Sequence, residues 1–358
     1  MEIIDLFSNF ASELCNLIRK MNKIKRNILL FVTIFIVMLI IAGTAFWAFS
    51  QALRAETNVR YTGTALIVSE RLTKTIRTME ANARNVFDEV ERHLDSPATV
   101  EKALMSKSLT NPDVRGYFTA FRPDYFKEKG RWYEPYVHQN QKGKFELTQV
   151  GSARHDYTKS EWYTQAEKIT MNFWSEPYYY YDGTNISGHY CTFIKPIFDD
   201  RGMMACVGGA DITLEWLSNE LLLIDEDIRT DEQLNRHPLT RGLEFYSVVI
   251  DDDGSCIAHP EGRNVPVKDI GVLMNMNNRK NGVAEMDIDG VASTLFFVPI
   301  EGMDWSVAVI VPRKDIERPF VYAGIALLLL AIIGSIIVWI VCRRITAGYK
   351  YERVYQTI

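Results

Sequence analysis

The sequence predicts an α+β fold in which a long N-terminal helix precedes two tandem antiparallel-sheet modules, all flanked by two transmembrane helices. Three observations predict it. Two uncharged apolar blocks lie near the ends of the 358-residue chain. A helical pattern without proline runs from the first block to Pro97. From Val114 onward, short aromatic and β-branched runs alternate with turn residues, as strands do.

The apolar blocks cover residues 27–53 and 319–342 and contain no charged residue. Each exceeds the roughly 20 apolar residues that cross a bilayer core of about 30 Å. We therefore predict transmembrane helices over 27–49 and 320–342. The first block is longer than the apolar part of a cleaved signal peptide and ends in no clear cleavage site, so we interpret it as an uncleaved signal anchor.

Charge sets the expected orientation. Nine basic residues flank the two blocks on their terminal sides, whereas residues 54–318 hold 31 basic and 41 acidic residues, a net charge of −10. The positive-inside rule then places residues 1–26 and 343–358 in the cytoplasm and residues 50–316 outside a bacterial inner membrane. The acidic exterior argues against a nucleic-acid partner. The lipid bilayer is an expected partner because of the two apolar blocks.

Two terminal stretches allow alternatives. Residues 1–20 show apolar positions at helical spacing, which indicates an amphipathic helix on the inner leaflet, or else translation starts at Met21. After Cys342, Arg343-Arg344-Ile345-Thr346 resembles the opening of a HAMP linker, but only 16 residues remain. We expect the cytoplasmic signalling output in a missing C-terminal part of a longer receptor or in a separate protein.

A long helix is expected over residues 51–95. Its apolar positions alternate steps of four and three, and they are Leu72, Ile76, Met79, Ala83, Val86 and Val90. Such a seam either docks the helix on its own domain or pairs it with a second subunit. We expect docking together with a homodimer.

The outside region then divides into two sheet modules, at about residues 100–215 and 243–312. Strands are predicted at 116–121, 188–198 and 203–212 in the first module and at 245–250, 282–286, 292–299 and 305–311 in the second. A helix at 161–168 interrupts the first set. Gly254 supplies the positive φ of a tight turn that begins at Asp251.

This order of elements resembles the double Cache (dCache) sensor domain of bacterial transmembrane receptors, which has two PAS-like modules. Segments 155–166, 174–190 and 208–217 resemble its membrane-distal module, and segments 248–265 and 298–316 its membrane-proximal module. The likeness covers about residues 55–316. It implies that the domain senses a small molecule outside the cytoplasm, binds it in the distal module and signals across the membrane.

In the amino-acid-binding branch of that family, the distal pocket uses a tyrosine, an arginine, a Trp-Tyr pair and a later aspartate. Trp162, Tyr163 and Asp211 match this pattern, while Ser160 stands at the arginine position and His155 at the tyrosine position. An arginine grips an α-carboxylate through two parallel hydrogen bonds, which serine cannot do. A standard α-amino acid is therefore a less favoured ligand.

The remaining candidates are aromatic or acidic, a set that suits an amine or another small polar metabolite, because carboxylates and ring faces attract an ammonium group. The complete candidate ligand-binding set is Trp162, Tyr163, Asp211, Tyr157, Glu161, His155, Tyr178, Tyr180 and Asp182. The alternative is that these aromatic residues are core, and that the chain is a membrane-anchored protein-binding or adaptor module.

No pattern indicates catalysis, a metal or a cofactor, since the sequence lacks a nucleophile–base arrangement, metal-ligand spacing and a phosphate loop. We expect a non-enzyme. Three cysteines lie outside the membrane, an odd number that disfavours a disulfide framework. With residues 199–202 as a turn, Cys206 is expected opposite Lys195 and Cys191 opposite Ala210, too far apart to bridge.

Overall fold

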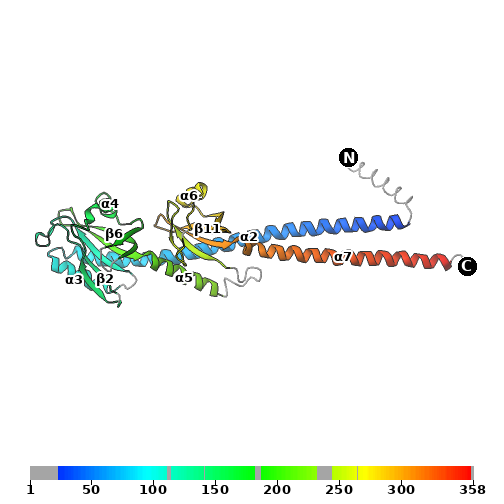
Figure 1. The fold of residues 1–358 in the computed structure, drawn as a ribbon, viewed down its shortest axis with the longest axis horizontal. Coiled ribbons are helices and arrows are strands. Elements are labelled where there is room, and N and C mark those ends of the chain that lie inside the picture. The colour runs from blue at the N-terminus through cyan, green and yellow to red at the C-terminus, as the bar shows by residue number, and fades with distance from the viewer. Residues whose placement is uncertain are drawn as a thin grey trace. The chain divides into compact units, whose positions relative to one another are not determined.

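The computed structural model describes residues 23–110, 114–140, 142–181, 187–231, 244–263 and 265–355. The chain divides into two units, one of residues 1–57 with 314–358 and one of residues 58–313. The predicted fold class is confirmed: a long helix, two antiparallel sheets and two flanking apolar helices (Figure 1). The expected amphipathic helix at residues 1–20 lies outside the described residues.

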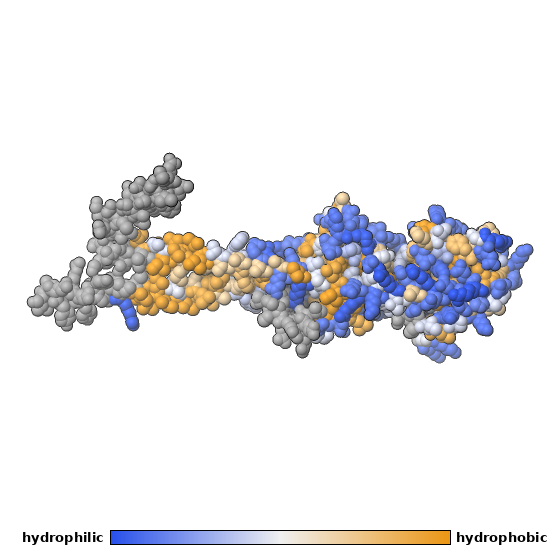
Figure 2. Space-filling view, turned by 180° about the vertical axis from the view of Figure 1, so that it is seen from behind, coloured by the Kyte–Doolittle hydropathy of each residue, from blue (hydrophilic) through white to orange (hydrophobic). Residues whose placement is uncertain are grey.

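The smaller unit is a pair of apolar helices, the first part of α2 (Lys23–Glu91) and α7 (Arg313–Tyr355). Phe46 faces Gly324, and Arg54 lies 5.6 Å from the ring centre of Phe320. Apolar side chains cover this pair (Figure 2), and both helices are long and apolar enough to cross a membrane. Their most apolar segments are not buried, so they are not the core helices of a soluble fold.

The C-terminal part of α2 carries the predicted seam, and all six seam residues are buried within this chain. The helix packs against both sheets. Its Phe87 ring lies at an edge-on angle 6.2 Å from Tyr117 of the first sheet, and Ser69 Oγ donates a 2.8 Å hydrogen bond to the carbonyl of Pro299 in the second. Docking on its own domain therefore accounts for the seam, and the homodimer stays a prediction.

The first module begins with α3 (Pro97–Ser108), which Ser96 caps, and contains a seven-stranded antiparallel sheet. The strand order is β3-β2-β1-β7-β6-β4, and β5 pairs with β6. The strands are β1 (Gly116–Phe121), β2 (Pro135–Gln139), β3 (Phe145–Gln149), β4 (Phe173–Trp174), β5 (Tyr178–Tyr181), β6 (Ser187–Phe198) and β7 (Met204–Thr213). The short helix α4 (Glu161–Ala166) follows a 3-10 turn at Tyr157–Lys159.

Side chains alternate between the two faces of this sheet. Tyr117 and Gly208 lie on the face against α2, where a Cβ on Gly208 would strike the ring of Phe87. Phe118 points to the opposite face and lies 5.0 Å from the ring of Trp162 in α4. The first sheet is therefore covered by α2 on one side and by α4 with its neighbouring loops on the other.

The expected register of β6 and β7 is wrong by two residues. Cys206 lies opposite Ile197, and Cys191 lies opposite Ile212. The loop is longer than the predicted turn, because the Asp199 amide donates to the Met203 carbonyl, and the register shifts after Ile197. The two cysteines are thus farther apart than expected, and Cys191, Cys206 and Cys256 are free thiols.

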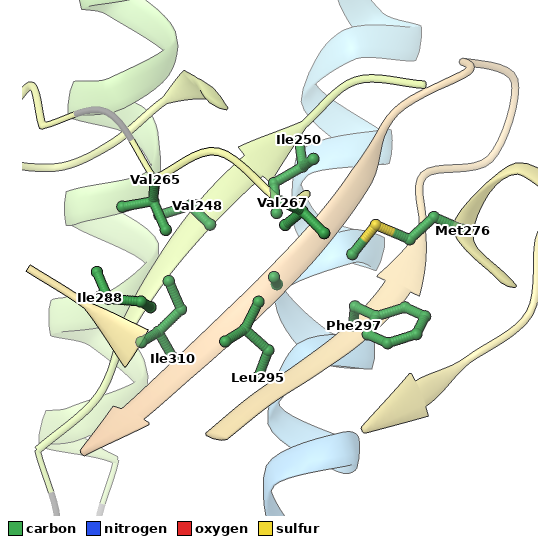
Figure 3. Close-up of a cluster of buried hydrophobic side chains, with 10 residues drawn as sticks. Val248, Ile250, Val265, Val267, Met276, Ile288, Leu295, Phe297 and Ile310 are labelled. Atoms are coloured by element: carbon green, nitrogen blue, oxygen red, sulfur yellow. The ribbon is translucent and has the colours of Figure 1, made fainter. Parts of the chain in front are cut away.

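The second module contains a five-stranded antiparallel sheet of order β10-β11-β12-β8-β9. Its elements are β8 (Tyr246–Ile250), β9 (Cys256–Ala258), α6 (Ile270–Asn277), β10 (Gly282–Ile288), β11 (Val291–Pro299) and β12 (Ser306–Pro312). Gly254 in the β8–β9 turn has a φ of +90°, as predicted. The core under α6 is apolar throughout, with Leu295, Phe297 and Met276 converging in Figure 3.

Helix α5 (Leu214–Thr230) connects the two modules and is fixed at both ends. At its start, the Thr213 hydroxyl accepts the Trp216 amide at 3.1 Å. Near its end, the buried Asp225 carboxyl accepts the backbone amide of Ser247 at 2.7 Å and the hydroxyl of Ser247 at 2.6 Å. This carboxyl attaches α5 to β8.

Replacing Asp225 with alanine is expected to lower the free energy of unfolding by about 2–3 kcal/mol, because two buried donors of Ser247 lose their acceptor. The matched control is Asp227→Ala, two residues further along α5, whose side chain is 65% exposed and pairs with Arg71. That surface ion pair is worth about 0–1 kcal/mol. Chemical denaturation of both variants measures the difference, and equal losses would contradict the attachment.

Candidate ligand-binding site

The first module encloses a cavity on the side of the sheet that faces α4. It holds about 30 Å³ of open space, enough for about two water molecules, since one needs roughly 10–15 Å³. A larger ligand requires side chains to move. The lining residues are Phe118, Glu134, Tyr136, Val150, His155, Trp162, Tyr178, Tyr180, Tyr190 and Asp211.

Strand register builds the floor of this cavity. Phe118 of β1 lies between Tyr136 of β2 and Gly209 of β7, and Asp211 lies opposite Gly116. Two glycines make room for the rings: a Cβ on Gly209 would lie 2.1 Å from the ring of Phe118, and a Cβ on Gly116 would lie 2.6 Å from the ring of Tyr136. The rings can therefore lie flat on the sheet, with the Asp211 carboxyl beside them.

Asp211 is 6% exposed and carries the strongest hydrogen bonds of the cavity. The Thr192 hydroxyl donates to its Oδ1 at 2.6 Å, and the Tyr178 hydroxyl lies 2.7 Å from the same Thr192 oxygen. Burial raises the pKa of Asp211 to about 7, although hydrogen bonds from Thr192, Tyr136 and Tyr178 oppose that shift. Asp211 therefore exchanges between its neutral and charged forms near neutral pH.

Glu134 is the second carboxyl of the cavity and is 3% exposed. Its Oε2 has no hydrogen bond, and the nearest cationic group is the His155 imidazole, with Nε2 at 3.5 Å. Burial raises the pKa of Glu134, and the contact with His155 opposes that rise. None of the described lining residues is lysine or arginine, and the two carboxyls are the acidic groups among them.

The structure places five of the predicted site residues in the lining: Trp162, Asp211, His155, Tyr178 and Tyr180. Tyr157, in the 3-10 turn, and Tyr163, in α4, are buried outside the lining, and the Tyr157 hydroxyl donates to the Phe121 carbonyl at 2.5 Å. Glu161 is exposed at the start of α4. Asp182 lies outside the described residues.

Sequence reasoning missed Glu134, Tyr136, Phe118, Tyr190 and Val150 as lining residues. Tyr136 lies in β2 and Glu134 directly precedes it, and the sequence analysis does not predict this strand. The alternation of Tyr133, Pro135 and Val137 with Glu134, Tyr136 and His138 was the available signal. A proline at the first position of a strand is compatible with that strand.

On the equivalent face of the second sheet, the pocket that the described residues form has no aromatic side chain in its lining, which includes Val265, Val272 and Asp287. There, the buried cluster of Val248, Ile250, Leu295, Phe297 and Ile310 fills the space (Figure 3). No group of three or more His, Cys, Asp or Glu that could hold a metal ion occurs among the described residues. The polar, aromatic cavity is thus a property of the first module.

Comparison with known proteins agrees with this assignment. Residues 100–219 match the family model described as "Methyl-accepting chemotaxis protein-like, first PDC sensor domain". That range contains the whole cavity lining. A search of curated protein sequences found no significant match.

Several solved structures share the fold of the whole outer domain. The periplasmic sensory domain of the Campylobacter jejuni chemoreceptor Tlp1 is 15% identical, with a TM-score of 0.59 over 75% of this chain and 99% of that one. The ligand-binding domain of Mlp24 with asparagine is 18% identical, with a TM-score of 0.51 over 76% and 98%. The ligand-binding domain of the Pseudomonas fluorescens chemoreceptor CtaA, in complex with L-isoleucine, is 16% identical, with a TM-score of 0.50 over 74% and 96%. The predicted double Cache fold is therefore confirmed.

Proposed function

We propose that this chain is the sensory part of a two-pass receptor of a bacterial inner membrane, and that it binds a small amine-bearing ligand in the distal cavity. The observation that carries the proposal is Asp211, a buried carboxyl at a strand end, surrounded by tyrosine rings and without a lysine or arginine beside it. An ammonium group would offset the cost of burying that charge. The faces of Trp162 and the tyrosines would add about 0.5–2 kcal/mol each.

The related domains of Mlp24 and CtaA are complexed with asparagine and L-isoleucine. An amino acid carries a carboxylate as well as an ammonium. The described lining residues here offer no guanidinium for that carboxylate, and Glu134 and Asp211 would repel it. We therefore favour an amine without an α-carboxylate.

The remaining parts of the proposal follow from charge and sequence. We propose that both termini are cytoplasmic, that the domain of residues 50–316 lies in the periplasm, and that the receptor works as a homodimer. Alkaline phosphatase fused after Arg318 and after Ile358 tests the topology, and activity at the second position would contradict it.

The ligand is tested with the full chain in lipid nanodiscs. We expect monoamines such as butylamine to bind by calorimetry and to raise the melting temperature, whereas butyrate does not. Trp162→Ala should weaken the binding about tenfold or more, because it removes a ring that faces the cavity. Binding of no small amine, with Asp211→Asn and Trp162→Ala leaving the receptor response unchanged, would favour the protein-binding alternative.

The pH dependence of amine binding is a separate prediction. The amine needs ionised Asp211, whose pKa of about 7 means that protonation competes with the ligand. Affinity should therefore fall about fivefold from pH 7 to pH 6 and stay level above pH 8. Calorimetry in two buffers of different ionisation enthalpy should show release of a proton at pH 6.5, and a flat affinity profile would contradict the assignment.

A further inference from the structure

The cavity contains two buried carboxyls, and the second one has no role in binding a monoamine. Glu134 lies on the same face of the sheet as Tyr136, because the two residues are two positions apart on one extended segment. The pairing continues past β2, since the Phe121 amide donates to the Tyr133 carbonyl at 3.0 Å. Glu134 therefore points into the cavity from the strand next but one to that of Asp211.

Register gives the spacing of the two groups. Asp211 is level with Gly116, and Glu134 is level with Ala120. This offset corresponds to about 13 Å along the strands and about 10 Å across them between the two Cα atoms. Both side chains lean into one cavity, so the carboxyls stand at its opposite ends rather than side by side.

The Glu134 carboxyl is incompletely satisfied. Its Oε2 is buried and makes no well-aligned hydrogen bond, and its one near partner is the His155 imidazole, which pairs with it at 3.5 Å when protonated. A buried acceptor in this condition costs about 1–3 kcal/mol. A second ammonium group would supply the missing donor and offset the negative charge at that end of the cavity.

Between the two carboxyls the lining is aromatic. The lining there includes the rings of Phe118, Tyr136 and Trp162. The ring centres of Phe118 and Tyr136 are 6.3 Å apart, and those of Phe118 and Trp162 are 5.0 Å apart. Such a surface suits an apolar chain that separates two cationic ends. A slender chain also requires less movement of side chains than a branched ligand, because the open space is only about 30 Å³.

We propose that the ligand is an unbranched aliphatic diamine, with one ammonium at Asp211 and the other at Glu134. The inference rests on the proposed amine-binding function and deepens it. It assigns Glu134 as the residue that selects a doubly charged ligand over a singly charged one.

The test measures the binding of α,ω-diamines with three to six carbons, and of the monoamines with the same chains, to the full chain in nanodiscs. We expect the best diamine to bind at least tenfold more tightly than its monoamine. We also expect one chain length to be preferred, because the strands fix the separation of the two carboxyls. Both results come from the unaltered protein, so they do not depend on the folding of any variant.

Glu134→Gln should reduce the ratio of diamine to monoamine affinity to near one. The matched control is Glu161→Gln, an exposed residue of α4 outside the lining, which should leave the ratio unchanged. Equal binding of monoamines and diamines by the unaltered chain would overturn this inference and leave the proposed function standing. Binding of no amine at all would overturn both.

Discussion

Asparagine at position 211 is expected to abolish amine binding while it raises the melting temperature of the unliganded protein by a few degrees at pH 8. The substitution removes a buried negative charge but keeps an acceptor for the Thr192 hydroxyl, which lies 2.6 Å from Oδ1. Burial is the main cause of the raised pKa of Asp211. A gain of 1 kcal/mol corresponds to about 2–4 °C in a domain of this size.

The difference in stability between Asp211→Asn and the unaltered protein should increase as pH rises. The pKa of Asp211 rises from 3.8 to about 7 on folding. From pH 4 to pH 7 the unfolded chain therefore binds fewer protons than the folded one, and the unaltered protein loses stability relative to Asp211→Asn as pH rises. Below pH 4 and above pH 7 the difference stays constant.

Melting temperatures of Asp211→Asn and of the unaltered protein between pH 4 and pH 8 measure this pH dependence. Asp200→Asn, which changes an exposed aspartate in the β6–β7 loop, is the control and should show no such trend. A variant that is less stable than the unaltered protein at every pH would show that Asp211 has a structural role instead.

Alanine at position 209 is expected to cause the other large effect. Its Cβ would lie 2.1 Å from the ring of Phe118, in a sheet where β7 is paired on both sides. Overpacking of this kind costs about 1–3 kcal/mol. Phe118 lines the cavity, so its displacement should also weaken ligand binding by tenfold or more.

Gly63→Ala is the matched control for this substitution. Gly63 lies in α2, and a Cβ there would meet no atom within 4 Å. Alanine is favoured over glycine in a helix by about 1 kcal/mol, so this variant should be as stable as the original or more so. Denaturation and amine titration of both variants check the prediction, and a harmless Gly209→Ala would contradict the packing of Phe118 on that strand.

The sequence predicted the elements that have strong local signals. The apolar helices, the seam of α2 and the strands with aromatic or β-branched runs need no knowledge of the fold. Trp162 and Asp211 were found through a family pattern. Glu134 and Tyr136 were not, because their strand begins with Pro135 and has mixed polarity. Only the pairing of β2 with β1 brings them into the cavity.

The β6–β7 register shows a second limit. The tripeptide Asp199-Asp200-Arg201 before Gly202 predicts a tight turn, and the Gly202 amide does donate to the Asp199 carbonyl at 2.8 Å. The Asp199 carboxylate also accepts the amides of Arg201 and Met203, and the strand pairing closes one residue later, at Met203. Hydrogen bonds from a side chain to nearby amides compete with the simplest turn. The register of the hairpin, and with it the residue opposite Asp211, follows from this loop together with the irregularity after Ile197.

Asp211 also stands two residues before Thr213, the cap of α5, and α5 ends beyond the Asp225 carboxyl that holds Ser247 of β8. The 17 residues of this helix form a rigid connection of about 25 Å. Its first turn follows the strand that carries Asp211, and its last turns contact the second sheet. A ligand that shifts Asp211 is therefore expected to displace β8 of the second module through α5. A change in the rate of hydrogen exchange at the Ser247 amide on ligand addition would support this displacement, and an unchanged rate would disprove it.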